Sequence, residues 1–421
     1  MNMIAVGIEA MNVFGGTTYI DVKELAEHRC LDMSRFENLL IKQKSVALPY
    51  EDPVTFAVNA AKPIVDSLSE DEKNCIELLI TCTESGIDFG KSLSTYAHYY
   101  LGLNRNCRLF EIKQACYSGT AGFQMAVNFI LSQASPGAKA LVIATDISRF
   151  MLPEGEQVAE QDWAYAELSG GAGAVAILVG ENPSVLKIDV GANGYYGYEV
   201  MDTCRPVPDS EAADVDLSLS SYLDCCEKAF LEYQKRVSGV DYQSTFQYLS
   251  FHTPFGGMVK GAHRSMMRKI IKANPSEIEE DFVRRVQNGI SYCQRVGNIM
   301  GATLYLSIAG TIDKGSYDIP KRIGCYSYGS GCCSEFYSGV ATRQGQERQW
   351  EFGIEKHLNE RYRLSMEEYN ALLRSSSTVK FGTRNLKSDF GFVPEAFESC
   401  KGKQKLFLED ISEFHRKYRW S

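Results

Sequence analysis

Continuous apolar segments that alternate with helical patterns constrain the fold of this chain more than any other feature. The apolar segments lie at residues 76–82, 140–145, 174–179, 248–252 and 322–327, and the helical patterns at residues 53–68, 118–132, 219–236 and 257–272. A strand that is apolar along its whole length is covered on both faces. The alternation therefore predicts an α/β fold with largely buried sheets.

Length and composition suit a protein of two domains, or of two fused halves of one fold. Of the 421 residues, 44% are hydrophobic and 23% are charged, as in ordinary soluble proteins. No apolar run approaches the roughly 20 residues that span a bilayer, and the first residues lack a signal-peptide pattern. We therefore expect a cytoplasmic protein. Residues 185–216, rich in Gly, Asn, Tyr and Pro, are predicted to form the passage between the two halves.

Charge and cysteine content argue against two classes of function. The chain has 44 Lys and Arg against 53 Asp and Glu, and this net charge of −9 argues against nonspecific nucleic-acid binding. Its 13 cysteines are scattered, and no Cys-x-x-Cys pair accompanies a histidine cluster. Reduced thiols are therefore expected rather than disulfides or a zinc site.

Cys116 is the candidate nucleophile. It lies in Ala-Cys-Tyr-Ser-Gly-Thr, just ahead of the helical pattern at residues 118–132. The positive end of the helix dipole favours thiolate over thiol, and Ser118 or Thr120 is predicted to cap the helix. The small residues that follow Cys116 leave room for a substrate. A buried structural cysteine is the alternative interpretation.

Two further candidates follow directly on predicted strands. Glu84, in Thr-Glu-Ser-Gly-Ile-Asp, ends the apolar segment at residues 76–82 at a glycine turn, which suits a general acid/base at a sheet edge. A solvated turn glutamate is its alternative. His252, in Phe-His-Thr-Pro-Phe-Gly-Gly, ends another strand, where an imidazole can orient a thiol or polarise a thioester carbonyl. A core histidine with its hydrogen bonds satisfied is the alternative there.

Asn298 and Ser330 are candidate donors to substrate oxygens. The side-chain amide of Asn298 suits donation to a carbonyl oxygen, and a helix cap is its alternative role. Ser330 lies in the glycine-rich turn Tyr-Gly-Ser-Gly after a strand, where a backbone N–H can face an oxyanion. A plain hairpin turn is equally compatible with that sequence.

A basic stripe is predicted on the helical pattern at residues 257–272. Lys260, Arg264, Arg268 and Lys272 recur every fourth residue and so share one face of a helix. In a chain with net charge −9, such a stripe indicates an anionic partner, either a phosphopantetheine phosphate or an acidic carrier-protein helix. The alternative is an ordinary solvated face.

Taken together, these segments resemble the 3-hydroxy-3-methylglutaryl-CoA synthase family of the thiolase superfamily, over roughly residues 4–340. Glu84 looks like the general acid/base of that family, Cys116 like its acylated nucleophile and His252 like its histidine. Asn298 and the turn at Ser330 match positions that line the thioester site. Residues 84–92, 101–107 and 413–420 resemble most closely the branch that performs β-branching in bacterial polyketide biosynthesis.

The resemblance implies a thiolase fold, in which two related α/β halves form five layers. The N-terminal half, residues 1–180, carries the nucleophile, and the C-terminal half, residues 181–421, carries the histidine. The family is homodimeric and uses no metal or redox cofactor, because its substrates arrive as thioesters on phosphopantetheine. The implied partners are a donor acetyl-acyl carrier protein and an acceptor carrier protein of a polyketide synthase, with no role for nucleic acid or membrane.

The resemblance also implies a reaction. Cys116 takes an acetyl group while N–H groups of Cys116 and Ser330 bind the oxyanion. Glu84 then removes a methyl proton, the carbanion adds to a β-ketone that His252 polarises, and hydrolysis frees the product. Three alternatives remain open: a primary-metabolism hydroxymethylglutaryl-CoA synthase that uses acetyl-CoA and acetoacetyl-CoA, a type III ketoacyl synthase built on Cys, His and Asn, and a carrier-binding scaffold without activity.

Overall fold

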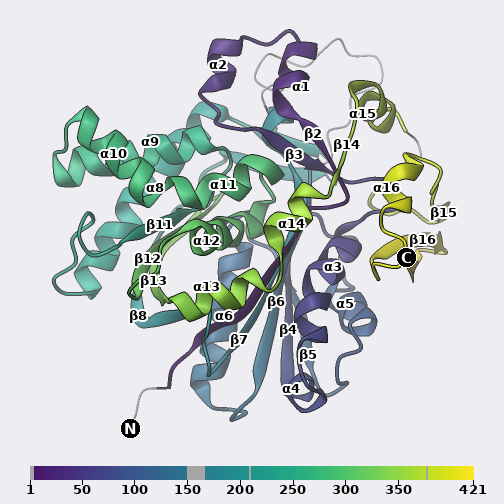
Figure 1. Cartoon of the computed structure of the whole chain (residues 1–421), viewed down its shortest axis with the longest axis horizontal. Helices are drawn as coiled ribbons and strands as arrows, with labels where there is room; N and C mark the ends of the chain where they lie inside the picture. The colour runs from purple at the N-terminus through teal and green to yellow at the C-terminus, as the bar shows by residue number, and fades with distance from the viewer. Residues whose placement is uncertain (1–3, 149–165, 208–209, 376–377) are drawn as a thin grey trace.

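The computed structural model describes residues 4–148, 166–207, 210–375 and 378–421, and a nine-stranded sheet forms its centre (Figure 1). The strands run in the order β11-β12-β13-β8-β1-β7-β6-β4-β5. Neighbouring strands are parallel in the pairs β4–β5, β4–β6 and β11–β12 and antiparallel elsewhere. The bounds are β1 Gly7–Phe14, β4 Ile76–Cys82, β5 Arg108–Ile112, β6 Lys139–Ile147, β7 Ala172–Gly180, β8 Leu186–Gly197, β11 Tyr248–Phe251, β12 Lys321–Gly329 and β13 Cys333–Ala341.

The sheet is covered on both faces, which explains its continuous apolar strands. In β4, Leu78 and Ile80 face one core cluster while Leu79, between them, faces another. Successive side chains of a strand point to opposite faces, so both faces of β4 must be apolar. All the predicted strands are present, and the predicted α/β class is confirmed.

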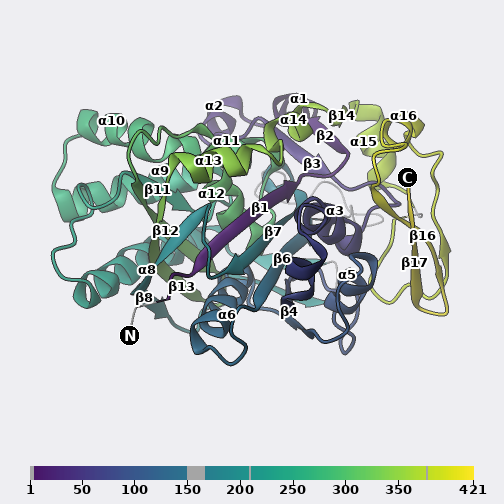
Figure 2. The ribbon, with the colours of Figure 1, turned by 60° about the horizontal axis from the view of Figure 1, so that its bottom comes forward.

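The helices arrange this sheet into five layers. β1 pairs with β8 only at Gly7 and Ile8. The sheet therefore has two parts that are joined at this point, the five strands β1-β7-β6-β4-β5 and the four strands β8-β13-β12-β11. Helices α6 (Ser118–Ser132) and α12 (Thr303–Lys314) lie between the two parts, α3 (Pro53–Asp66) covers one outer face and α8 (Val215–Arg236) the other (Figures 1 and 2). The division of the chain after residue 180 stays a prediction.

Shorter elements complete the chain. The remaining helices are α1 Val22–His28, α2 Met33–Glu37, α4 Glu70–Asn74, α5 Ser94–Tyr100, α9 Gly256–Met266, α10 Pro275–Arg285, α11 Gln287–Val296, α13 Arg343–Trp350, α14 Ile354–Asn359, α15 Met366–Leu373 and α16 Pro394–Glu398, with a 3₁₀ turn η2 at Met300–Ala302. The small sheets are β14-β2-β3 (Tyr362–Arg363, Thr18–Asp21, Gln43–Val46), β10-β9 (Ser210–Ala213, Thr203–Val207) and β15-β16-β17 (Leu386–Lys387, Leu406–Ser412, His415–Trp420).

Three local predictions were wrong. Neither Ser118 nor Thr120 caps α6, because both lie inside the helix and Thr120 Oγ1 donates instead to Ser327 Oγ at 2.8 Å. The helix predicted at residues 257–272 changes after Met266 into a π-helical turn, η1 (Met267–Ile271), that ends at Lys272 with φ of 64°. Residues 185–216 are no mere passage, since they supply β8 to the central sheet and the strands β9 and β10.

The C-terminal hairpin β16–β17 is anchored on the first half of the chain. Asp52 caps α3 and, through its other oxygen, accepts hydrogen bonds from Arg416 Nη1 at 2.7 Å and Tyr418 Oη at 2.8 Å. All three side chains are buried. The end of the chain therefore packs against the start of α3. Within the described residues, no helix is long and apolar enough to cross a bilayer.

Gly122 tests the packing of α6 against the sheet. A Cβ at this position would lie 2.4 Å from Cys82 Sγ and 3.2 Å from Val142 Cγ1. We expect Gly122→Ala to lower the free energy of unfolding by about 1–3 kcal/mol in urea titrations, because overpacking outweighs the gain in helix propensity. Gly261→Ala in α9, where a Cβ meets nothing within 4 Å, is the matched control and should be neutral or stabilising. Equal stability of the two variants would contradict this account of the packing.

Candidate active site

Cys116 lies two residues ahead of α6, in the short connection that follows β5. The residue before it, Ala115, has φ of 43°, a left-handed conformation that turns the chain sharply into the helix. The Cys116 thiol is partly exposed and donates to Glu84 Oε1 across 3.7 Å. The structure therefore brings the candidate nucleophile and the candidate acid/base into direct contact.

The Glu84 turn is fixed by a buried carboxylate at the end of β6. Asp146 Oδ1 accepts hydrogen bonds from the backbone N–H groups of Glu84 and Ser85 and from Thr83 Oγ1, each at 2.9 Å. Asp146 is completely buried, and this desolvation raises its pKa to about 6. Three donors converging on one oxygen leave the turn little freedom.

Arg205 holds the Glu84 side chain from the opposite side. Its Nε lies 3.7 Å from Glu84 Oε2, and its Nη1 donates to the Glu84 carbonyl oxygen at 3.3 Å. Arg205 belongs to β9, which the sequence had placed in a connecting passage. The ion pair and the hydrogen bond from Arg205 restrict the orientation of the Glu84 side chain beside Cys116.

His252 follows β11 and is buried. Its backbone N–H donates to the Tyr326 carbonyl oxygen at 2.8 Å, and its backbone carbonyl accepts from Tyr222 Oη at 2.7 Å. The backbone of His252 is therefore held on both sides. Burial lowers the pKa of His252 to about 3. The imidazole is therefore neutral near pH 7. Its Nδ1 is buried and has no hydrogen-bond partner among the described residues.

The turn that carries Ser330 lies against the Cys116 segment. A Cβ at Gly329 would be 2.5 Å from the Tyr117 nitrogen, so the two backbones touch at this point. Asp202 fixes the turn by accepting from Tyr328 Oη at 2.6 Å and from the Gly331 N–H at 2.9 Å. The Ser330 turn is thus fixed against the backbone of Tyr117, the residue that follows Cys116.

The loop that carries Asn298 packs on the start of α6. A Cβ on Gly119 would lie 2.1 Å from the Gly301 carbonyl oxygen. Asn298 Oδ1 accepts from the Met300 N–H at 3.0 Å and from Thr303 Oγ1 at 2.9 Å, so it does cap the following helical turns. Its amide N–H groups are still available as donors, and the two roles considered for this residue are compatible.

Four of the predicted site residues, or the loops that carry them, thus meet around the start of α6. Glu84 contacts Cys116 directly, and the Asn298 loop and Ser330 turn pack against the same segment. His252 lies at the end of β11, and its N–H is bonded to Tyr326 of β12, the strand that leads to the Ser330 turn. Among the described residues, no three His, Cys, Asp or Glu side chains cluster as metal ligands.

The predicted basic residues lie on a separate helix. Lys260 pairs with Glu279 of α10 at 2.8 Å, whereas Arg264 and Arg268 project into solvent. The π-helical turn moves Lys272 off the regular four-residue spacing. The exposed residues of the predicted stripe are Arg264, Arg268 and Lys272, and the neighbouring Lys269 is held by Glu227.

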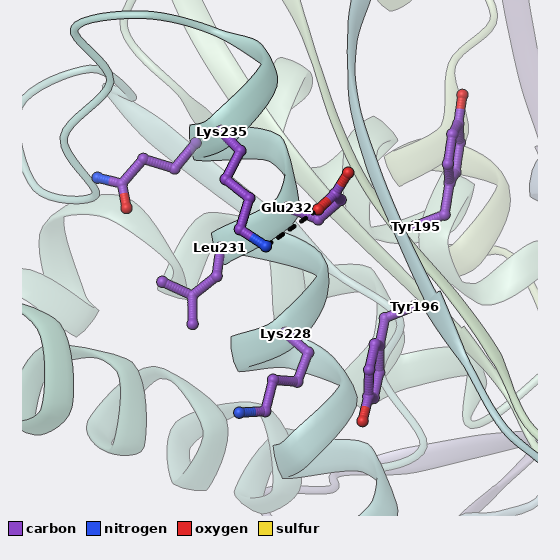
Figure 3. A pocket seen from close by; sticks show the side chains of 7 residues that line it. Tyr195, Tyr196, Lys228, Leu231, Glu232 and Lys235 are labelled. Carbon is purple, nitrogen blue, oxygen red and sulfur yellow. Dashed lines mark hydrogen bonds and ion pairs between the residues drawn. The ribbon is translucent and has the colours of Figure 1, made fainter.

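A hollow elsewhere on the molecule contains none of these candidate residues. It measures about 450 Å³ and lies between β8 and α8, and it is lined by Tyr195, Tyr196, Lys228, Leu231, Glu232, Gln234 and Lys235 (Figure 3). Lys235 points to Glu232 and pairs with it at 3.4 Å. The hollow lies outside the cluster around Cys116, and its paired charges suit a solvated surface.

Three functional residues escaped sequence reasoning. Asp146 follows the predicted strand at residues 140–145, so the signal that found Glu84, an acid at a strand end, was also present there. Asp202 and Arg205 lie in a segment without periodicity, and no local pattern separates them from other polar loop residues. Only tertiary contacts identify their roles.

Comparison with known proteins decides the family. Models of the N-terminal and C-terminal regions of hydroxymethylglutaryl-coenzyme A synthase match residues 3–184 and 264–419. The polyketide biosynthesis 3-hydroxy-3-methylglutaryl-ACP synthase PksG of Bacillus subtilis is 74% identical over 418 residues, covering 99% of this chain and 100% of the relative. The chain belongs to the hydroxymethylglutaryl-coenzyme A synthase family. The hydroxymethylglutaryl-CoA synthase of Enterococcus faecalis is more distant, at 32% identity over 88% of this chain and 91% of its own.

Solved structures agree with this assignment and with the predicted thiolase fold. PksG from Bacillus subtilis superposes with a TM-score of 0.94 at 73% identity, covering 99% of this chain and 100% of the other. The hydroxymethylglutaryl synthase of the curacin pathway, solved with an acetyl donor-ACP, has a TM-score of 0.95 at 63% identity and the same coverage. Both the α/β fold of this family and its acyltransferase class therefore apply to this chain.

The buried neutral His252 has a consequence for stability. Below pH 6.5 the unfolded chain takes up a proton at this position while the folded chain does not, so stability present above pH 6.5 is lost as the pH falls toward 3. In His252→Gln, the decrease in unfolding free energy from pH 7 to pH 5.5 should be about 1 kcal/mol smaller than in the unmodified protein. Urea titrations at both pH values measure it. His415→Gln, at an exposed site, should keep the original dependence; an unchanged dependence in His252→Gln would contradict a neutral buried imidazole.

Proposed function

We propose that this protein is a hydroxymethylglutaryl synthase of polyketide β-branching. It would take an acetyl group from an acetyl-carrier protein and add its methyl carbon to the β-ketone of a carrier-bound polyketide. The contact of 3.7 Å between Cys116 Sγ and Glu84 Oε1 carries the proposal, because the reaction needs a nucleophile and a base at one carbon. The similarity to PksG, a polyketide biosynthesis synthase, supports the choice of substrate class.

Acetyl transfer is the first step. The Cys116 sulfur attacks the acetyl thioester carbonyl, its proton passes to Glu84, and N–H groups of Cys116 and Ser330 bind the oxyanion. Collapse forms the acetyl-Cys116 thioester and breaks the bond to the phosphopantetheine sulfur. Glu84 returns the proton to this leaving thiolate, so the carboxylate is ionised again when the carrier departs.

Condensation follows on the bound acetyl group. Glu84 removes a proton from the acetyl methyl, and the enolate carbon forms a bond to the β-ketone carbon of the polyketide. The neutral imidazole of His252 and the amide of Asn298 hydrogen-bond to the carbonyl oxygens of the reactants. Glu84 then protonates the new tertiary alkoxide. Water hydrolyses the Cys116 thioester, which frees the thiol and leaves a carboxymethyl branch.

Two exposed arginines, Arg264 of α9 and Arg268 of the following turn η1, suit the delivery of a carrier protein. Arg264 and Arg268 project from a helix that follows the His252 strand by only a short connection. Because the chain as a whole carries a net charge of −9, a local basic surface favours an anionic partner over the rest of the molecule. The curacin synthase has been solved with its donor-ACP, which supports a carrier as partner here.

Three further properties are part of the proposal. The family resemblance implies a homodimer and a reaction that runs without a metal or redox cofactor, and the sequence pattern favours a cytoplasmic location. β5 is the last strand in the sheet order, and its outer edge is available to a second copy of the chain. The steps above use thioester substrates and side-chain acid–base groups alone.

Glu84 separates this chemistry from a ketoacyl synthase, which decarboxylates a malonyl unit and needs no such base. In Glu84→Ala, condensation should fall at least about a thousandfold because the methyl proton has no acceptor, while acetylation of Cys116 remains detectable. Intact-mass spectrometry follows acetylation, and product formation follows condensation. Asp88→Ala, in the same loop but exposed, is the matched control. Normal condensation in Glu84→Ala would instead favour the ketoacyl synthase, and no acetylation of the unmodified protein would favour an inactive scaffold.

The identity of the acetyl donor distinguishes a β-branching synthase from a primary-metabolism synthase. We expect Cys116 to be acetylated faster by an acetylated carrier protein than by acetyl-CoA, and charge reversal in the double variant Arg264→Glu, Arg268→Glu should lower the carrier rate about tenfold or more. The rate from acetyl-CoA should change little. The double variant Lys356→Glu, Lys401→Glu, at two exposed positions, makes the same change in net charge and is the control. Fast and selective transfer from acetyl-CoA would identify a primary-metabolism enzyme, the function of the Enterococcus faecalis relative.

A further inference from the structure

A buried carboxylate of the second half of the chain is bonded to the residue that follows the nucleophile. Glu335 lies on β13 and is completely buried. It accepts hydrogen bonds from Tyr117 Oη at 2.7 Å, Gln124 Nε2 at 3.0 Å and Asn193 Nδ2 at 3.1 Å. Two of these donors flank the first turns of α6, and the third belongs to β8.

This carboxylate is held by neutral donors. Burial raises the pKa of Glu335 to about 7, and Arg236 acts on it only as a more distant charge. An acid in such a place is costly to the fold, and an apolar residue of similar size is commonly cheaper there. The bond to Tyr117 therefore needs a reason other than stability.

The position of Glu335 in its hairpin supplies that reason. Glu335 lies directly opposite Ser327 in the β12–β13 ladder, and Ser327 accepts from Thr120 Oγ1 of α6. Gly329, the last residue of β12, touches the backbone of Tyr117. Three points of one hairpin thus fix the start of α6, and the tip of that hairpin is the turn that carries Ser330.

We propose that Glu335 is a positioning residue for acyl transfer, which sets Cys116 against the Ser330 N–H by holding the Tyr117 hydroxyl. The inference rests on the proposed acyl transfer at Cys116. An oxyanion site works only when its donors and the attacking atom are held in register, and a displacement of about 1 Å can cost a hundredfold in rate. Loss of the Tyr117 bond frees the segment that carries the sulfur.

Two reactions of the same thiol test this role. Acetyl transfer from acetyl-CoA or an acetylated carrier needs the oxyanion site, whereas alkylation by iodoacetamide does not. Tyr117→Phe should lower the acetylation rate about tenfold or more, mainly through kcat, and leave alkylation of Cys116 within about twofold. Peptide mass spectrometry assigns both modifications to Cys116.

Substitutions at Glu335 complete the test. Glu335→Ala should reproduce the loss seen in Tyr117→Phe, whereas Glu335→Gln should stay within about threefold of the unmodified rate. The glutamine oxygen still accepts from Gln124 and Asn193, and its amide can donate to the Tyr117 oxygen. If Glu335→Ala fails to fold, the Tyr117→Phe result decides alone.

A matched control is a tyrosine of α8 that is bonded to the same strand as Tyr117, β13. Tyr233 Oη is paired with Ser338 Oγ of β13 at 2.9 Å, so Tyr233→Phe removes a similar buried bond away from Cys116 and should acetylate normally. The inference is overturned if Tyr117→Phe acetylates at the original rate, if its alkylation falls by the same factor, or if Tyr233→Phe shows the same loss. Failure of the unmodified protein to accept acetyl from either donor would overturn the proposed function itself.

Discussion

Backbone contact at the start of α6 is the constraint on which the site depends. Gly119 meets the carbonyl of Gly301 on one side, and Gly329 meets the backbone of Tyr117 on the other. Any side chain at the three glycines would push the neighbouring segments apart. These main-chain contacts hold the Cys116 segment between two loops of the second half, and the hydrogen bond from Tyr117 to Glu335 adds a side-chain restraint. The site around the nucleophile of the first half is thus completed by loops of the second half.

The sequence predicted the parts of this site that are local in the chain. Glu84 and His252 were found as polar residues at the ends of apolar segments, and Cys116 as a cysteine just ahead of a helical pattern. The family resemblance then joined them into one site. The contacts that hold these residues could not be predicted from the sequence, because Arg205 and Asp202 bind residues more than a hundred positions away in the chain. The absence of the predicted cap of α6 has a similar cause, because the Thr120 hydroxyl donates to Ser327, which is distant in sequence.

Buried carboxylates, rather than packed hydrocarbon, hold the loops of the site. Asp146 accepts hydrogen bonds from a turn, Asp202 from a hairpin tip, and Glu335 from the start of α6 and from β8. The folded-state pKa values of Asp146 and Glu335 are raised to about 6 and about 7, so each contributes less stability as the pH rises from 4 through those values. Stability near neutral pH is exchanged for fixed geometry, as is common at functional sites.

The bond between Asp52 and Arg416 has a consequence for the order of synthesis. The two residues are 364 positions apart, so the acid that caps α3 leaves the ribosome long before the cation that pairs with it. Until the last strand is made, the Asp52 carboxylate must keep its water, and the face of α3 that the final hairpin covers stays open. Docking of the hairpin is therefore a closing event of folding, and a nascent chain that stops short of Arg416 retains an unpaired acid where the complete protein has a buried ion pair.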